Sequence, residues 1–233
     1  MFNWISNNSP KEEVMNSLYE NFSNVVRKIG MQLINHPIFY NAQIGIRFEI
    51  GGDESIYIDN LPADENLYNL EYVNAAVNRA ISIYLSLPHP PNILRIDTYP
   101  DEEYDLQVDT LEKLIGLGLP HPDEQKLVSL HQENEYDSIK QLQSYWRVKE
   151  PFCFESLLKE IIIGDIGGSI SELISNVYFV NSDDCVLFHL YDDRGADLVA
   201  ADKELLRPIY EKYNEWILDY DRGQISKIFE KCT

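Results

Sequence analysis

The sequence predicts an α+β protein, in which a mixed or antiparallel sheet is flanked by helices. Short stretches of alternating apolar and polar residues, typical of strands, are separated by longer stretches with helical spacing. Residues 177–200 contain three short, mainly apolar stretches joined by polar turns, the first two typical of a hairpin and the last of a third short strand. At 233 residues the chain can bury a core without disulfides or a metal. We expect a single domain, with a division into two lobes around residues 120–136 left open.

The N-terminal half, residues 1–120, is expected to hold two long helices, a hairpin and a further strand. A cap at Ser9-Pro10 precedes the first helical pattern, and Pro37 ends it. Alternating residues before and after Gly51-Gly52 are typical of a hairpin. The predicted elements are helix 10–34, strands 44–50 and 55–59, helix 64–86, strand 92–99 and helix 108–117.

The C-terminal half, residues 137–233, follows a polar segment that we expect to form a mobile loop, residues 121–136. Its first strand should place Tyr145 and Trp146 on opposite faces. None of the boundaries in the chain has the composition of a linker, so we expect the two halves to form one continuous unit. The predicted elements are strand 141–148, helix 154–163, strands 177–180, 186–191 and 198–200, a helix capped by Asp202, and helix 221–231 capped by Asp221.

The charge balance argues against nucleic acid as a partner. With 39 acidic and 19 basic residues, the formal net charge is −20, whereas a nucleic-acid reader needs a cationic face. Such acidity favours solubility or attraction to a basic protein. We expect no membrane span, because none of the stretches reaches the ~18 apolar residues that one requires. The three cysteines are far apart and odd in number, which is typical of reduced thiols in the cytoplasm.

The densest local group of charged residues lies near the carboxyl end, among aromatic residues. Asp192, Asp193 and Arg194 follow a predicted strand, and Arg47 and Glu49 share one side of an earlier strand. We take this group as a candidate binding or structural cluster. Its members are Arg47, Glu49, Tyr191, Asp192, Asp193, Arg194, Asp197, Trp216, Asp219 and Asp221.

Two interpretations of the Asp192-Asp193 pair compete. A metal site would use both carboxylates, with His189 or Asp197 as a further ligand, because Mg²⁺ and Mn²⁺ prefer carboxylate oxygens. On an extended strand, however, His189 and Asp193 lie on one side and Asp192 on the other, so the ligands converge only if the turn redirects them. In the alternative, an aspartate accepts backbone hydrogen bonds in the turn and Arg194 pairs with a neighbouring acid. We favour this structural role, and predict no cofactor.

Two stretches resemble a bacterial family catalogued as domain of unknown function 3885 (DUF3885). The C-terminal stretch lies within residues 177–229 and comprises Tyr191-Asp192-Asp193-Arg194-Gly195 together with residues 206–222. Upstream, residues 39–51 are similar to the N-terminal element of longer family members. The resemblance implies no activity, since the family has no established one to carry over. It implies one continuous architecture, because both ends of the chain share the same family pattern.

Two functions follow from these observations. We favour a non-catalytic cytoplasmic binding protein, such as an immunity-type neutraliser of a basic toxin or a partner of another basic protein. Its basis is the negative charge together with the lack of a catalytic motif, since the sequence contains neither G-x-S-x-G nor H-E-x-x-H. The alternative is a metal-dependent hydrolase or transferase that uses Asp192 and Asp193.

Overall fold

The computed structural model describes residues 17–52, 54–58, 68–99, 106–131, 138–149, 152–164, 166–168 and 170–230. Its strands are β1 (Gly45–Glu49), β2 (Ile93–Thr98), β3 (Glu124–His131), β4 (Ser138–Arg147), β5 (Val177–Asn181), β6 (Val186–Leu190) and β7 (Gly195–Ala200). Its helices are α1 (Leu18–Lys28), α2 (Leu70–Leu85), α3 (Leu106–Gly116), α4 (Phe154–Ile163), α5 (Lys203–Lys212) and α6 (Asp219–Phe229). Short 3-10 turns cover Ile38–Tyr40, Ser171–Leu173 and Asn214–Trp216. Within this part of the chain, no helix has both the length and the apolar character to cross a bilayer.

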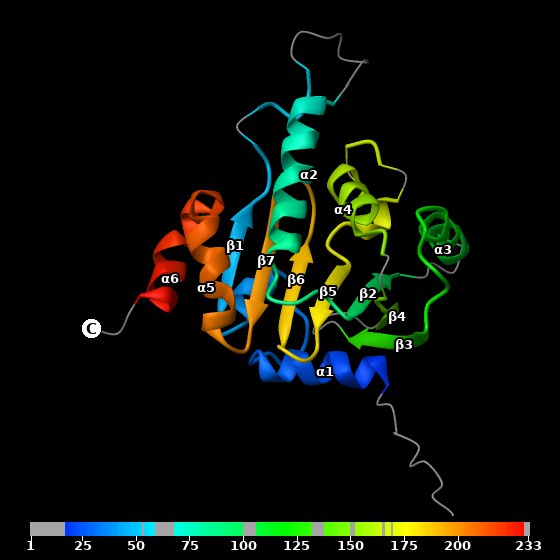
Figure 1. The fold of residues 1–233 in the computed structure, drawn as a ribbon. Coiled ribbons are helices and arrows are strands. Elements are labelled where there is room, and N and C mark those ends of the chain that lie inside the picture. The colour runs from blue at the N-terminus through cyan, green and yellow to red at the C-terminus, as the bar shows by residue number, and fades with distance from the viewer. Residues whose placement is uncertain are drawn as a thin grey trace, which may run out of the picture.

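The strands form one open sheet of seven strands in the order β1-β7-β6-β5-β2-β4-β3, and every pairing is antiparallel. Helices flank the sheet, with α1 set apart from the other helices (Figure 1). The predicted α+β class is therefore confirmed. The sheet interleaves strands from both halves of the sequence, because β1 pairs with β7 and β2 lies between β5 and β4.

The pairing of β1 differs from the predicted hairpin. Its partner is β7, with Arg47 opposite Asp197, whereas in residues 54–58 Tyr57 forms an isolated bridge with Tyr68. The apolar side of β1 lies in the core and requires an equally buried neighbour, which β7 supplies with all six of its residues buried. Tyr57 and Ile58 are 42% and 49% exposed, so their segment cannot cover that side. The hairpin prediction is wrong because alternation identifies a strand but not its partner.

Residues 124–131, which the sequence analysis places in a loop, form the edge strand β3. All eight of them pair with β4, from Glu124 opposite Tyr145 to His131 opposite Ser138. An edge strand contacts one neighbour and keeps much of its surface in water, so its polar composition conceals it from a search for apolar alternation. Residues 132–136 of the predicted loop lie outside the described residues.

Three helix boundaries also differ from prediction. Helix α1 ends at Lys28 instead of residue 34, because Gly30 has a left-handed φ of +94° that terminates the helix. Helix α2 starts after Asn69, whose side chain accepts a hydrogen bond from the Glu71 amide. Helix α6 starts at Asp219, so Asp221 lies in its first turn and is not its cap. The predicted beginning of the first helix lies outside the described residues.

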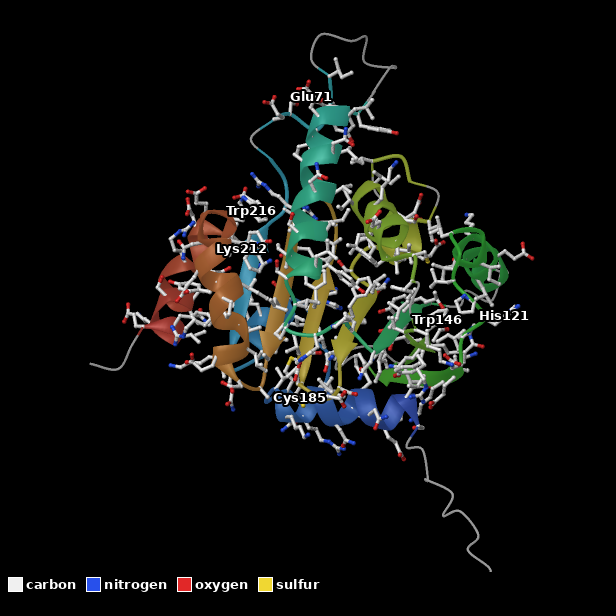
Figure 2. All side chains as sticks on the ribbon, viewed as in Figure 1. Glu71, His121, Trp146, Cys185, Lys212 and Trp216 are labelled. Carbon is white, nitrogen blue, oxygen red and sulfur yellow. The ribbon has the colours of Figure 1, made fainter. Side chains whose placement is uncertain are left out.

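The sheet separates two cores of unequal size. The larger core packs α2, α4, α5 and α6, with Leu114 of α3, against one face, and it includes Trp146. The smaller core packs α1 and the segment after it against the other face, and it includes Tyr145 and Cys185. Figure 2 shows Cys185 close to α1. Tyr145 and Trp146 thus lie on opposite faces, as predicted. We call the side of the smaller core the α1 face.

Replacing a residue of the larger core tests this arrangement. Ile161 of α4 is fully buried, so we expect Ile161→Ala to lower the free energy of unfolding by about 2–5 kcal/mol. The matched control is Ile115→Ala in α3, where the side chain is 37% exposed and the expected loss is below about 1 kcal/mol. Urea unfolding followed by circular dichroism measures both, and equal losses would contradict the assignment of the core.

Candidate functional site

A row of polar side chains crosses the α1 face from one edge of the sheet to the other. The register places Arg47 opposite Asp197, Asp197 opposite His189, and Arg95 opposite both Tyr178 and Tyr145, which in turn is opposite Glu124. The His189 and Tyr178 rings close the row, stacked with their centroids 4.9 Å apart. The members of this polar row are Arg47, Asp197, His189, Tyr178, Arg95, Tyr145 and Glu124. All seven strands contribute one residue each.

One end of the polar row gathers around Arg47. Its Nε lies 3.6 Å from Asp197 Oδ1 and donates to the Tyr191 hydroxyl at 3.1 Å, and its Nη1 donates to the Tyr40 hydroxyl at 3.1 Å. The Tyr40 hydroxyl in turn donates to Asp221 Oδ1 at 2.9 Å. The candidate residues Arg47, Tyr191, Asp197 and Asp221 are therefore brought together by contacts between β1, β7, α6 and the residue that follows β6.

Burial shapes the electrostatics at this end. It raises the pKa of Asp197 to about 6, although the Phe39 amide, which donates to Oδ2 at 3.0 Å, opposes that rise. Burial also raises the pKa of the Tyr191 hydroxyl. For Arg47, burial favours the neutral form, but hydrogen bonding to Tyr191 and the negative charge of Asp197 outweigh it and raise the pKa. Arg47 is thus a fixed cation, and Asp197 titrates within the range of mildly acidic pH.

His189 lies at the centre of the polar row and has no contact with solvent. His189 is fully buried, and its ring lies 4.7 Å from the His36 ring. Its Nε2 donates to the Ser175 carbonyl at 3.1 Å, which leaves Nδ1 as an acceptor. Within the described residues, this Nδ1 and Asp197 Oδ1 are the buried side-chain atoms without a hydrogen-bond partner. Burial, followed by the effect of His36, lowers the pKa of His189 to about 3, so the ring is neutral at physiological pH.

Asp192 and Asp193 point to different parts of the molecule. Asp192 Oδ1 accepts the Arg194 amide at 2.8 Å and its Oδ2 accepts the Arg194 guanidinium, so it closes the turn between β6 and β7. Asp193 Oδ2 accepts the Tyr72 hydroxyl of α2 at 2.6 Å. The turn therefore directs Asp192 toward the α1 face with Tyr191, and Asp193 away from it, which reverses the sides expected for an extended strand. Across the described residues, no three histidine, cysteine, aspartate or glutamate side chains are grouped to hold a metal ion.

The remaining candidates lie apart from the cluster. Glu49 is exposed at the end of β1. Trp216 stacks on Tyr213 with the ring centroids 4.6 Å apart, and Figure 2 places it beside α5 with Lys212. Asp219 faces solvent and pairs with Arg222 at 2.9 Å. None of these three contributes to the polar row.

The middle of the polar row holds a buried ion pair that the sequence analysis missed. Arg95 Nε and Nη2 each donate to one oxygen of Asp97 at 2.7 Å, although the two residues are only 6% and 1% exposed. Burial favours the neutral form of Asp97 and raises its pKa. Burial also favours the neutral form of Arg95, but the attraction of the Asp97 carboxylate is larger, so the pKa of the guanidinium is raised. The signal in the sequence was a basic and an acidic residue two apart in an otherwise apolar strand, since such residues share one side.

Two pockets open on the α1 face, with His36 in the wall between them. The first, of about 360 Å³, is lined by Arg47, Tyr191, Asp192 and Arg194, together with His36. The second, of about 600 Å³, contains the Arg95–Asp97 pair. His36 Nε2 lies 2.8 Å from the Tyr178 hydroxyl, so the polar row itself holds the wall in place.

A family model described as a domain of unknown function, DUF3885, matches residues 16–221, which include all seven strands and the whole polar row. The chain belongs to the DUF3885 family. It is also 44% identical over 45 residues to the uncharacterized protein YnaE of Bacillus subtilis, a segment that covers 19% of this chain and 21% of that protein. This chain therefore aligns with about a fifth of the length of that relative. No solved structure matches the chain.

The chemistry open to this DUF3885 chain is limited by access. The two atoms of the polar row without a hydrogen-bond partner, His189 Nδ1 and Asp197 Oδ1, are sealed from solvent. A general base must come within hydrogen-bond distance of its substrate, so neither atom is accessible for that role in this conformation. Arg47 and Arg95 are different, because both line pockets. A molecule entering either pocket would therefore meet Arg47 or Arg95 and not the two sealed atoms.

The glycine of the family turn offers a test of the Arg47 contacts. A methyl group on Gly195 would overlap the Tyr191 hydroxyl, which Arg47 contacts. We expect Gly195→Ala to displace that ring and to lower the free energy of unfolding by about 1–3 kcal/mol. The control is Gly223→Ala in α6, where nothing lies within 4 Å and the alanine should stabilise by up to about 1 kcal/mol. Urea unfolding measures both, and a neutral Gly195→Ala would show that Tyr191 is not held as described.

The polar row also predicts a dependence of stability on pH. Between the unfolded value near 6.5 and the folded pKa of about 3, the unfolded chain takes up a proton at His189 that the native state cannot. The free energy of unfolding should therefore fall as the pH drops from 6.5 toward 3, by at most about 1.4 kcal/mol per pH unit. We expect His189→Gln to reduce this sensitivity, measured by urea unfolding between about pH 4 and 7.

The Asp197→Asn variant should respond in the opposite direction. Because the folded pKa of Asp197 is about 6, its protonation favours the native state as the pH falls through 6 toward 4. Removing this group should make the loss of stability in acid steeper than in the unmodified protein. If both variants kept the unmodified slope, the burial of these two groups would be disproved.

Proposed function

We propose that this chain is a non-catalytic binding protein that captures a basic protein, in the manner of an immunity-type neutraliser of a toxin domain. The proposal rests on the distribution of charge and on one exposed aromatic residue at the C-terminal helices. An acidic surface accelerates encounters with a basic partner and rejects acidic ones.

Five of the eight arginines of the chain form ion pairs within the protein. Ion pairs within the protein engage Arg47, Arg95, Arg194, Arg207 and Arg222, each with an aspartate or glutamate. Acidic residues outnumber basic residues by 39 to 19, so these pairs leave a large excess of carboxylates without a basic partner. An excess of this kind supports long-range attraction of a cationic protein.

The observation that carries the proposal is Tyr220. Its side chain is 86% exposed, the largest value among the large apolar and aromatic residues in the described part of the chain. The exposed residues Glu211, Glu215 and Asp219 precede it along α5, the 3-10 turn and the start of α6. Interfaces are enriched in tyrosine at positions that contribute most to binding, and surrounding charges select the partner. We define Glu211, Glu215, Asp219 and Tyr220 as the capture surface.

The metal-dependent alternative receives no such support from the described residues. Asp192 is engaged by Arg194 and Asp193 by Tyr72, and the two carboxylates point apart. A divalent ion would require both aspartates to leave these partners. We therefore do not carry the hydrolase or transferase forward.

The capture surface predicts the outcome of a binding experiment. The first candidate to co-express is the product of any basic, toxin-like reading frame adjacent to this one. We expect binding to weaken as salt rises, because the attraction is electrostatic. Tyr220→Ala should weaken it about thirtyfold, the loss typical of a central interface residue, and Glu215→Lys should slow association. Calorimetry and surface plasmon resonance measure these changes.

A control elsewhere on the surface separates the capture surface from general charge. Glu155 is exposed at the start of α4, in the larger layer of helices but outside the capture surface, so Glu155→Lys changes the net charge by the same amount as Glu215→Lys. Equal effects of the two variants would overturn the assignment of the surface. A chain that binds no basic protein at low salt would overturn the proposed function itself.

A further inference from the structure

The larger pocket on the α1 face has the features of a built ligand site. Its volume of about 600 Å³ lies in the range of small-molecule sites. Polar groups gather at its floor on β2 and β4, and apolar side chains form its mouth between α1 and β3. We call this pocket the Arg95 groove. Its lining residues in the described part include Phe22, Leu33, Arg95, Asp97, Tyr99 and Leu130.

At the floor of the groove, the Arg95 guanidinium is held in place through two of its three nitrogen atoms. Asp97 holds Nε and Nη2 of Arg95, and the rings of Phe22 and Tyr178 lie 4.7 and 5.3 Å from the guanidinium carbon. Among the described residues, Arg95 Nη1 has no hydrogen-bond partner, and it is not one of the sealed atoms. Arg95 is buried and lines the groove, so its guanidinium is oriented in advance.

A chain of hydrogen bonds delivers a second donor to the same groove. The Tyr145 hydroxyl donates to Gln143 at 2.8 Å, Gln143 donates to Gln141 at 2.8 Å, and Gln141 donates to the Tyr99 hydroxyl at 3.0 Å. Because the Tyr99 oxygen already accepts, its own proton remains to be donated. The chain also fixes the orientation of both amides. A ligand in the groove therefore meets donors at Arg95 and Tyr99, which select an acceptor.

The charge and the walls of the groove define the rest of the ligand. Asp97 is the one carboxylate among its described lining residues and is engaged by Arg95, while Lys126 lies just outside with its Nζ 3.2 Å from the centre of the Tyr19 ring. The charges of Arg95 and Lys126 are balanced by Asp97 and by Glu124, which accepts the Tyr19 amide at 3.4 Å, so an anion is favoured by the donors of Arg95 and Tyr99 and not by net charge. At the mouth, Leu33 is 71% exposed and Leu130 is 38% exposed, so an apolar body would bury surface that now faces water.

We propose that the Arg95 groove binds a small organic carboxylate with an apolar body. The carboxylate accepts from Arg95 Nη1 and the Tyr99 hydroxyl, and the apolar body extends along Val26, Leu33 and Leu130 toward the mouth. This site is separate from the capture surface on α5 and α6, and it holds whether or not that surface binds a protein.

Straight-chain carboxylates are the probes for this proposal. Isothermal calorimetry and thermal unfolding of the full chain are measured with butanoate, hexanoate and octanoate, and with octanamide as the neutral counterpart. We expect the carboxylates to raise the melting temperature, since they bind the native state. Affinity should rise about fourfold for each added methylene group until the groove is filled. Octanamide should bind at least about tenfold more weakly than octanoate, because it lacks the charge.

Three variants locate the site. Tyr99→Phe should weaken octanoate binding about tenfold, with Tyr57→Phe as the matched control, since the two tyrosines are 43% and 42% exposed and Tyr57 is outside the groove. Leu33→Asp, at the exposed mouth, should abolish binding without affecting the core. The double variant Arg95→Met/Asp97→Leu should fold, because apolar residues commonly replace a buried ion pair without loss of stability, and it should not bind.

Several results would overturn the proposal. They are the absence of a melting shift with every carboxylate, equal binding of octanamide and octanoate, or undiminished binding by both Tyr99→Phe and Leu33→Asp. Tyr99→Phe and Leu33→Asp therefore test the proposed carboxylate site even if the double variant fails to fold.

Discussion

The rest of the structure depends on the cost of burying polar groups on the α1 face of the sheet. A buried charge or hydroxyl costs several kcal/mol unless other groups satisfy it. Here many of the satisfying groups come from residues 18–40, because Glu124 accepts the first amide of α1 at 2.7 Å and Asp197 accepts the Phe39 amide at 3.0 Å. The polar row therefore fixes both ends of the segment that covers it. The ring of Phe22 lies over Arg95 between these two ends.

The elements that could be predicted from the sequence are those whose pattern is local. Helix α4 begins and ends as predicted, and the hairpin of β5 and β6 follows from two apolar stretches around a polar turn. The partner of β1 is far away in the sequence, so alternation could not identify β7. Strand β3 could not be found because its stability comes from pairing with β4 and its composition is that of a loop. The end of α1 at Gly30 was accessible to prediction, since glycine commonly terminates helices.

The candidate site was predictable in part. Grouping Arg47, Tyr191, Asp197 and Asp221 by residue type placed together four side chains that are close in space. The sequence could not show that Asp192 and Asp193 diverge, because the direction of each carboxylate depends on the turn and on α2. The groups of the Arg95 groove were missed for a different reason. They come from four strands, a helix and the segment after it, and only the antiparallel register brings the strand residues to one side of the sheet.

The layer formed by α1 and the segment after it is thinner than the layer of helices on the other face. Among the described residues, a single helix and a short connection form the smaller core on this face, and a layer with so few contacts is the part expected to open first. The surface then uncovered includes Arg95, Asp97, Glu124 and Lys126 among its apolar residues. Inward-pointing charges of this kind discourage sheets from associating with one another. Charges on this face would therefore oppose association between molecules whose α1 layer has opened.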